Sequence, residues 1–249
     1  AIGLVKFDFL GLKNLTIIDE TIEAIRREEP GFNLGKIPLD DEAAYAMISS
    51  GHTDGMFQLE SAGMRQLLMR LKPHSIEDIM ISIALYRPGP MDAIPRYLEN
   101  RADPSKIKYK VSTLAEILNE TSGVIVYQEQ VMQIFRAVAG YSYGQADIVR
   151  RAISKKKANV IQAERAGFIE GAVKLGCSPE DAQELFEDMT AFANYGFKKG
   201  HAAAYAVISY QTAYLKAHYP GQYLAALMTS VLGSPAKLAE YIAECTRLG

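Results

Sequence analysis

The segment NLTIIDETIEAIRREE, residues 14–29, indicates the fold class of this chain, because its apolar residues recur at the spacing of one helix face. Four isoleucines form this stripe, Ile17, Ile18, Ile22 and Ile25. The pair Pro30-Gly31 follows and marks the end of the helix, since it cannot continue one. We therefore expect an amphipathic helix over residues 14–29 with a buried isoleucine face.

Similar start and stop signals predict helices along the rest of the chain. Acidic residues 40–42 precede a helix over residues 43–50, and we expect them to cap it rather than to hold a metal. Further helices are predicted from Ser75 to a turn at Pro88-Gly89-Pro90, over residues 130–139, from Ser178-Pro179, and over residues 201–218 up to Pro220. The apolar run 124–127 fits either a strand or a helix. With no repeat, low-complexity tract or Gly/Ser linker, we expect a mainly α fold in one compact helical body.

The composition is that of a folded chain without a membrane segment. The 249 residues include 27 Lys plus Arg and 29 Asp plus Glu, and 49% are hydrophobic, which suffices for one large domain or two small ones. The apolar stretch 202–208 is far shorter than the roughly 18 residues of a membrane span. The first residues lack the pattern of a signal peptide, and the chain begins as if cut from a longer one.

Cysteine and histidine usage argues against a structural metal site. Cys177 and Cys245 lie far apart, so neither a zinc ribbon nor a disulfide framework is indicated, and a reducing cytoplasm is expected. The remaining candidates, His52, His74 and His218, do not have the spacing of metal ligands, and we interpret them as ordinary surface or core residues.

The alternating run LVKFDF, residues 4–9, predicts a short strand with Lys6 and Asp8 on one face. A carboxylate in this position could hold a metal ion close to a phosphate. The ordinary alternative is a solvated strand face, and a single Asp cannot complete a two-metal site. The chain contains no Asp-x-Asp pair that would supply the other carboxylates.

The most distinctive cluster of charge lies in residues 140–157. Residues 150–165 carry six cations and one Glu, although the net charge of the chain is only −2. Arg150 and Arg151 could grip phosphate oxygens bidentately, which predicts a triphosphate or a nucleic-acid backbone as the ligand. A solvated helix face with a basic end is the alternative.

Residues 195–205 place Lys198, Lys199 and His201 among glycines immediately before a predicted helix. The N-terminus of a helix favours anions, so this segment is a second candidate for phosphate binding. The run of small residues that follows is explained equally well by close packing between helices. No Walker loop, nucleophile elbow or dinucleotide fingerprint occurs in the chain.

Six segments, in order along the chain, resemble motifs of the bacterial C-family DNA polymerases. They are LVKFDFLGL at residues 4–12, GMFQLES at 55–61, LYRPGPM at 85–91, VYQEQVM at 126–132, residues 140–157, and residues 196–220. Together they span nearly the whole sequence. The resemblance implies that residues 1–12 are the end of the palm with its last catalytic strand. It also implies that residues 13–249 are the helical fingers domain.

The resemblance implies a role for Asp8 as one of three catalytic carboxylates that bind two Mg²⁺ ions. The other two belong to an Asp-x-Asp motif of the palm, which this sequence lacks, so the chain by itself is expected to be inactive. Lys6, Arg150 and Arg151 match residues near the incoming triphosphate. Lys199 also matches a residue of the nucleotide site.

His201 matches, with Lys199, a segment near the nascent base pair. Gln58 and Arg87 are weaker candidates for contacting DNA or shaping the pocket. Four positions depart from the family pattern, since Lys198 stands where Asn is usual, Gly200 where Ser is usual, and Tyr143 and Gln145 where Leu and Gly are common. An additional lysine keeps this segment basic, but it puts the hydrogen bonds of the usual Asn and Ser in doubt.

These matches imply part of a replicative enzyme that carries out template-directed DNA synthesis by two-metal nucleotidyl transfer. The implied partners are primer-template DNA, a dNTP and, in a complete polymerase, the sliding clamp and other replisome subunits, with no membrane involved. One alternative is a helical nucleic-acid-binding or interaction module without catalysis. An error-prone paralogue of the same family is another, because the motifs are shared too widely to separate the two.

Overall fold

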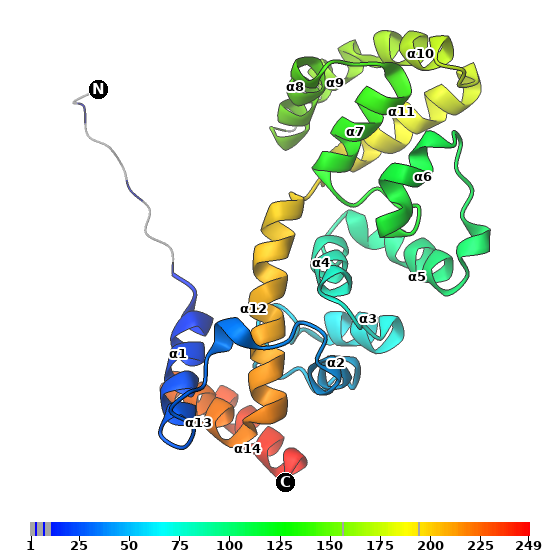
Figure 1. The fold of residues 1–249 in the computed structure, drawn as a ribbon. Coiled ribbons are helices and arrows are strands. Elements are labelled where there is room, and N and C mark those ends of the chain that lie inside the picture. Colours follow the sequence, from blue (N-terminus) through cyan, green and yellow to red (C-terminus); the bar gives the residue numbers. More distant parts are fainter. Residues whose placement is uncertain (1–2, 4–6, 8–10, 156, 194) are drawn as a thin grey trace. The chain divides into compact units, whose positions relative to one another are not determined.

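The computed structural model describes residues 3, 7, 11–155, 157–193 and 195–249, and this part of the chain is helical (Figure 1). The helices are α1 (Lys13–Arg26), α2 (Glu42–Ser49), α3 (Ala62–Leu71), α4 (Ile76–Leu85), α5 (Ile94–Ala102), α6 (Thr113–Leu118), α7 (Gln128–Ala139), α8 (Tyr143–Ser154), α9 (Ala158–Ala163), α10 (Arg165–Lys174), α11 (Pro179–Ala193), α12 (Lys199–His218), α13 (Pro220–Ser230) and α14 (Pro235–Leu248). The mainly α fold is confirmed. The expected strand over residues 4–9, with Lys6 and Asp8, falls outside the described ranges except for Phe7 and stays a prediction.

The chain forms two compact units rather than the single helical body that we expected. Unit 1 contains the described residues up to His74 and those from Ile208 onward, and unit 2 contains residues 75–207. The second boundary falls inside α12, so no linker marks it in the sequence. The expectation was wrong because a continuous helix can belong to two sets of contacts, and composition does not detect such a division.

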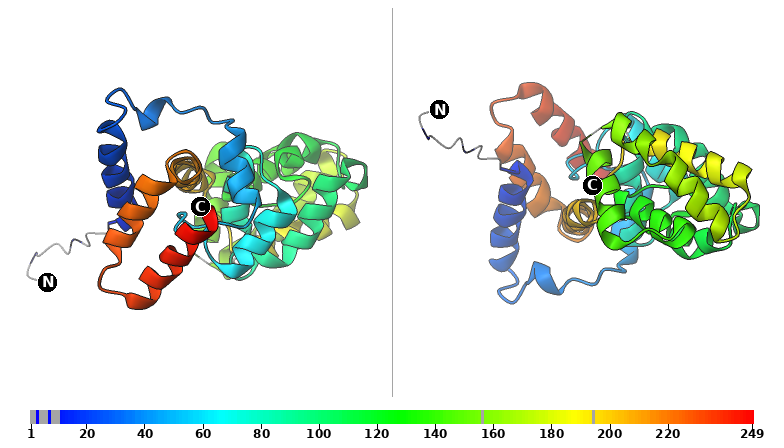
Figure 2. Two further views of the ribbon diagram at one scale, coloured as in Figure 1. Left: turned by 90° about the horizontal axis from the view of Figure 1, so that it is seen from below. Right: turned by 90° about the horizontal axis from the view of Figure 1, so that it is seen from above.

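Unit 1 is built around the isoleucine stripe of α1. Ile17, Ile18 and Ile25 are buried and pack in one cluster with Tyr223, Leu224 and Leu227 of α13. Both views of Figure 2 show α1 beside α13, although the two helices are far apart in sequence. The predicted amphipathic face is therefore confirmed.

Three predicted helix starts are capped by the expected side chains. Asp41 accepts a hydrogen bond from the Ala44 amide at 2.8 Å, Ser75 from the Asp78 amide at 3.3 Å, and Ser178 from the Asp181 amide at 3.0 Å. Each bond satisfies an amide that has no partner within its own helix. His218 also lies 2.9 Å from the Asp41 carboxylate.

Unit 2 has an aromatic core contributed by α7, α10 and α11. The ring centroid of Phe135 lies 4.8 Å from that of Phe168 and 6.3 Å from that of Phe186. Helix α10 approaches α7 closely at Gly171, where an added Cβ would lie 2.2 Å from the carbonyl oxygen of Ala139. Only glycine fits there without a shift of the backbone.

A buried ion pair lies inside unit 1. Lys216 Nζ lies 2.6 Å from Glu244 Oε1, with the two side chains 0% and 1% exposed. The same ammonium donates to the carbonyl oxygens of His52 at 2.8 Å and Asp54 at 2.9 Å. Burial lowers the pKa of Lys216 from 10.5 to about 8. The group therefore remains protonated at pH 7, where its charge is paired with Glu244 and it donates to two carbonyl oxygens.

None of the helices in the described ranges combines the length and the apolarity needed to cross a bilayer.

Replacing Gly171 with alanine should destabilise unit 2. The added methyl group collides with the Ala139 carbonyl, and overpacking of this kind costs about 1–3 kcal/mol of unfolding free energy. Gly144→Ala is the matched control, because Gly144 is also helical and nothing lies within 4 Å of an added Cβ. The urea midpoint of unfolding should fall for Gly171→Ala and stay level or rise for Gly144→Ala; equal midpoints would contradict the close approach of α10 to α7.

Replacing Lys216 with methionine should destabilise unit 1 by about 3–5 kcal/mol, because it removes one partner of a buried ion pair. Lys237→Met is the control, since Lys237 pairs with Glu240 on the surface with both side chains about half exposed. Such a surface pair contributes about 0–1 kcal/mol. Thermal unfolding followed by circular dichroism tests this difference, and similar midpoints for the two variants would refute the role of the buried pair.

Candidate functional site

The predicted pair, Arg150 and Arg151, lies on α8, and both side chains form ion pairs with the Asp147 carboxylate. Arg150 donates from Nε and Nη2 to Asp147 Oδ1, at 2.8 and 2.7 Å, and Arg151 Nε lies 2.7 Å from Asp147 Oδ2. The bond from Arg150 is the first cause of the lowered pKa of Asp147, so this carboxylate stays ionised at neutral pH. Arg151 is 68% exposed. The trio therefore presents two positive charges and one negative charge on the surface of unit 2.

The second predicted segment, residues 196–201, is tied to the start of α7. The Gln128 amide donates to the Phe197 carbonyl at 2.8 Å, and Gln128 Nε2 donates to the Gly196 carbonyl at 3.0 Å. Tyr127 and Phe197 form an isolated parallel β-bridge. This bridge answers the question left open for residues 124–127, which form neither a helix nor a strand of a sheet.

The first amide of α12 already has an anionic partner within the protein. The Lys199 amide donates to Glu129 Oε2 at 3.0 Å. Lys199 Nζ lies 2.6 Å from Glu120 Oε2, with both side chains partly exposed, and 5.8 Å from the centre of the Tyr127 ring. The N-terminus of a helix favours an anion, and at this amide the chain itself supplies one, the Glu129 carboxylate.

His201 belongs to an aromatic row rather than to an ion pair. Its ring lies 5.2 Å from the Phe197 ring and 4.2 Å from the Tyr205 ring, centre to centre. The side chain is exposed. It therefore presents an imidazole beside Lys199 at the start of α12.

Arg87 contacts the segment that precedes α12. Its Nη2 donates to the Tyr195 carbonyl at 2.8 Å, its Nε to the Ala84 carbonyl at 3.2 Å, and its guanidinium lies 4.1 Å from the centre of the Phe197 ring. Burial lowers the pKa of Arg87. These contacts give Arg87 a positioning role.

The glycine of the same LYRPGPM motif allows an aromatic ring to sit on the backbone. Gly89 has φ of +101°, and an added Cβ would lie 2.2 Å from Tyr195 Cδ1. Both the backbone conformation and the close approach require glycine. The motif therefore holds residues 195–197 through Arg87 and Gly89.

Gln58 lies in unit 1, whereas the other described candidates lie in unit 2. It is exposed and has φ of +63°, an uncommon conformation for a residue other than glycine. The residue before it is fixed by α12, since the Phe57 amide donates to Thr212 Oγ1 at 3.2 Å and Ser209 Oγ donates to the Phe57 carbonyl at 2.8 Å. The GMFQLES and SYQT motifs are thus structural partners within unit 1.

The structure therefore brings three of the predicted site residues to one place, the start of α12. These are Arg87, Lys199 and His201, which meet around the Phe197 and Tyr127 rings. Arg150 and Arg151 lie on α8 of the same unit.

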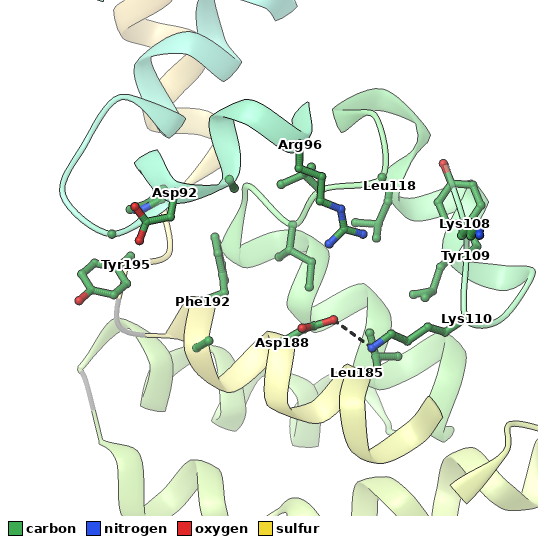
Figure 3. Close-up of a pocket in the computed structure, with 18 residues that line it drawn as sticks. Asp92, Arg96, Lys108, Tyr109, Lys110, Leu118, Leu185, Asp188, Phe192 and Tyr195 are labelled. Carbon is green, nitrogen blue, oxygen red and sulfur yellow. Dashed lines mark hydrogen bonds and ion pairs between the residues drawn. The ribbon is translucent and has the colours of Figure 1, made fainter. Parts of the chain in front are cut away.

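Sequence reasoning missed a cavity of about 390 Å³ in unit 2, shown in Figure 3. Its polar lining includes Arg96, Lys108 and Lys110, and its aromatic lining includes Phe192 and Tyr195. These residues come from three separate stretches of chain. No spacing in the sequence links them, and only the five cations within residues 96–110 could have drawn attention to the region.

The described residues do not supply a metal site. No group of three or more His, Cys, Asp or Glu side chains among them is arranged to hold a metal ion. Asp8, the predicted Mg²⁺ ligand, is outside the described ranges. The described residues therefore do not by themselves form a site for two Mg²⁺ ions.

Comparison of the sequence with known proteins matches the chain to one family. The bacterial DNA polymerase III alpha subunit finger domain matches residues 14–176. The DNA polymerase III subunit alpha of Halalkalibacterium halodurans is 45% identical over 249 residues, which is 100% of this chain and 22% of that protein.

The same subunit of Bacillus subtilis is 46% identical over 249 residues, covering 22% of its length, and that of Staphylococcus aureus is 46% identical over 250 residues, covering 23%. The chain thus spans less than a quarter of the length of these relatives. The resemblance drawn from the motifs is confirmed, and the chain belongs to the family of the bacterial DNA polymerase III alpha subunit finger domain.

Proposed function

We propose that this chain binds the incoming dNTP and template DNA during template-directed synthesis, as the fingers portion of a replicative polymerase. The observation that carries the proposal is the arrangement of Arg150 and Arg151 on one carboxylate of α8. Family membership supports it, because the relatives are alpha subunits of DNA polymerase III.

Asp147 orients the two guanidinium groups for binding a phosphate ligand. It engages the Nε edge of each group, which fixes their planes before any ligand arrives. A guanidinium has five N–H donors, so the exposed Arg151 can engage phosphate oxygens in addition to Asp147. Exposed Lys155 and Lys157 follow close behind in sequence and add positive charge. A triphosphate suits such a site.

The residues at the start of α12 have a different proposed role. Lys199 and His201 would lie near the nascent base pair, and Lys6 near the triphosphate, as the motif matches imply. Arg87 acts as a positioning residue through Tyr195 and Phe197. Gln58 is expected to shape the pocket rather than to contact substrate.

Catalysis requires groups that this chain does not provide. Asp8 is proposed as one metal-binding carboxylate, with Mg²⁺ as the ion, and the Asp-x-Asp pair that completes the set is absent from the sequence. By the same resemblance, the sliding clamp and other replisome subunits are partners of a complete polymerase, and the location is the cytoplasm.

Titration of a Mg²⁺-dNTP mixture into the chain by calorimetry should detect weak binding that is lost in the Arg150→Ala, Arg151→Ala double variant. Each guanidinium contributes charge-assisted hydrogen bonds, and such a bond contributes about 1.5–3 kcal/mol. Arg165→Ala is the control, because Arg165 is an exposed arginine paired with Glu187 elsewhere in unit 2. Equal affinities of the chain and the double variant would contradict the clamp.

A salt series distinguishes the clamp from a module that only binds nucleic-acid backbone. A backbone binder should prefer oligonucleotide to dNTP and lose affinity steeply as salt rises, since it displaces many counterions. The proposed clamp should instead retain selectivity for the triphosphate over the nucleoside monophosphate. Oligonucleotide binding with no such selectivity would favour the non-catalytic alternative.

We also expect the chain by itself to be unable to extend a primer in the presence of Mg²⁺, because a two-metal transfer needs more carboxylates than Asp8 alone. A gel assay with a labelled primer-template and all four dNTPs checks this, with a complete polymerase as the positive control. Extension that persists in an Asp8→Asn variant would point to a contaminating enzyme. Extension abolished by Asp8→Asn would refute the expectation.

A further inference from the structure

The cavity of unit 2 has an uneven distribution of charge. Lys110 Nζ lies 3.0 Å from a Glu184 oxygen and 3.2 Å from an Asp188 oxygen, so two carboxylates occupy this ammonium. Arg96 and Lys108, by contrast, are exposed and have no ion pair within the described part of the chain. Figure 3 shows the guanidinium of Arg96 pointing into the cavity. Two cations are therefore available to an anionic ligand.

The other end of the cavity offers aromatic surface. Figure 3 shows Phe192, Tyr195 and Asp92 together at this end, with Lys108 and Tyr109 at the opposite end. The Tyr195 ring is 44% exposed, and it is held in place because it packs directly on Gly89. A held, exposed ring is a stacking platform for a flat ligand.

Asp92 adds an acceptor beside these rings. In the residues that the structure describes, its carboxylate has neither an ion pair nor a hydrogen-bond donor, while its own amide donates to the Gly89 carbonyl at 3.3 Å. A carboxylate in this position repels phosphate and accepts hydrogen bonds from the amino group of a base such as cytosine. The cavity is thus polarised, with the anion favoured at Arg96 and the ring at Tyr195.

We propose that this cavity receives one nucleotide of an unpaired DNA strand, with its base against Phe192 and Tyr195 and its phosphate at Arg96 and Lys108. This inference rests on the proposed function, and it assigns the strand a binding place separate from the triphosphate clamp on α8. Bases that carry an amino group are preferred, because Asp92 can accept from them.

The chemistry favours a phosphodiester over a free triphosphate. A volume of about 390 Å³ falls within the range of small-ligand pockets, roughly 300–1,000 Å³, so it suits a single nucleotide. Two cations are sufficient to neutralise the single charge of a phosphodiester, whereas a triphosphate would bring several charges close to Asp92 and Asp188. The aromatic surface suits a base, which stacks with little dependence on sequence.

Fluorescence anisotropy with short labelled oligodeoxycytidylate and oligothymidylate tests the proposal on the 249-residue chain. The Arg96→Gln, Lys108→Gln double variant should weaken binding and reduce the salt slope by about 0.7 for each phosphate that the protein no longer neutralises. The Tyr195→Leu variant should weaken binding by about five- to 150-fold, the range that corresponds to removing one stacked base. Its salt slope should stay unchanged.

The Asp92→Ala variant tests whether Asp92 contacts the base, because loss of a merely structural contact would not change the base preference. The preference for deoxycytidylate over thymidylate should disappear in this variant, even where overall affinity rises because a negative charge is gone. The matched control is the Arg70→Gln, Lys72→Gln double variant, which removes the same charge from exposed positions of unit 1. Circular dichroism of every variant checks that the helices are retained.

Three results would overturn the proposal: no oligonucleotide binding by the chain, equal losses in the cavity and control double variants, or a base preference unaffected by Asp92→Ala. Binding of free nucleoside monophosphate as tight as that of the oligonucleotide would also count against a strand as the occupant.

The Mg²⁺-dNTP titration of the cavity variants separates this inference from the proposed function. If the cavity variants retain triphosphate binding and their oligonucleotide binding is unchanged, the cavity proposal alone is contradicted. If triphosphate binding is lost only in the α8 variant, neither proposal is contradicted.

Discussion

The hydrogen bond from the Gln128 amide to the Phe197 carbonyl, at 2.8 Å, is the constraint on which the arrangement of unit 2 depends. It joins the start of α7 to the start of α12, two points that lie far apart in the sequence. The Lys199 amide, bound to Glu129, adds a second tie two residues further along. Because these bonds fix the main chain, the side chains of residues 195–201 have defined places.

Arg87 and Gly89 complete this arrangement from the end of α4. The guanidinium bonds the Tyr195 carbonyl and lies over the Phe197 ring, while the glycine leaves room for the Tyr195 ring. Three motifs that resemble one polymerase family thus converge on one short segment. The aromatic wall of the cavity in Figure 3 is a consequence of the same contacts.

The cations of the chain fall into two kinds according to their partners. Lys216 is fully buried and satisfied by Glu244 and two carbonyl groups, so it acts in the stability of unit 1. Arg150 and Arg151 share a single carboxylate at the surface. The first kind is closed to a ligand, whereas the second includes the exposed guanidinium of Arg151. Counting basic residues in the sequence does not separate the two kinds.

The sequence by itself determined the mainly helical class, several of the helices with their caps, and the family. Asp41, Ser75 and Ser178 cap where their spacing predicted, because a cap depends on residues three positions apart. The tertiary structure alone decided the division inside α12, the pairing of Lys199 with Glu120 and the cavity around Arg96. These features join residues that are tens of positions apart, and only the packing of helices brings such residues together.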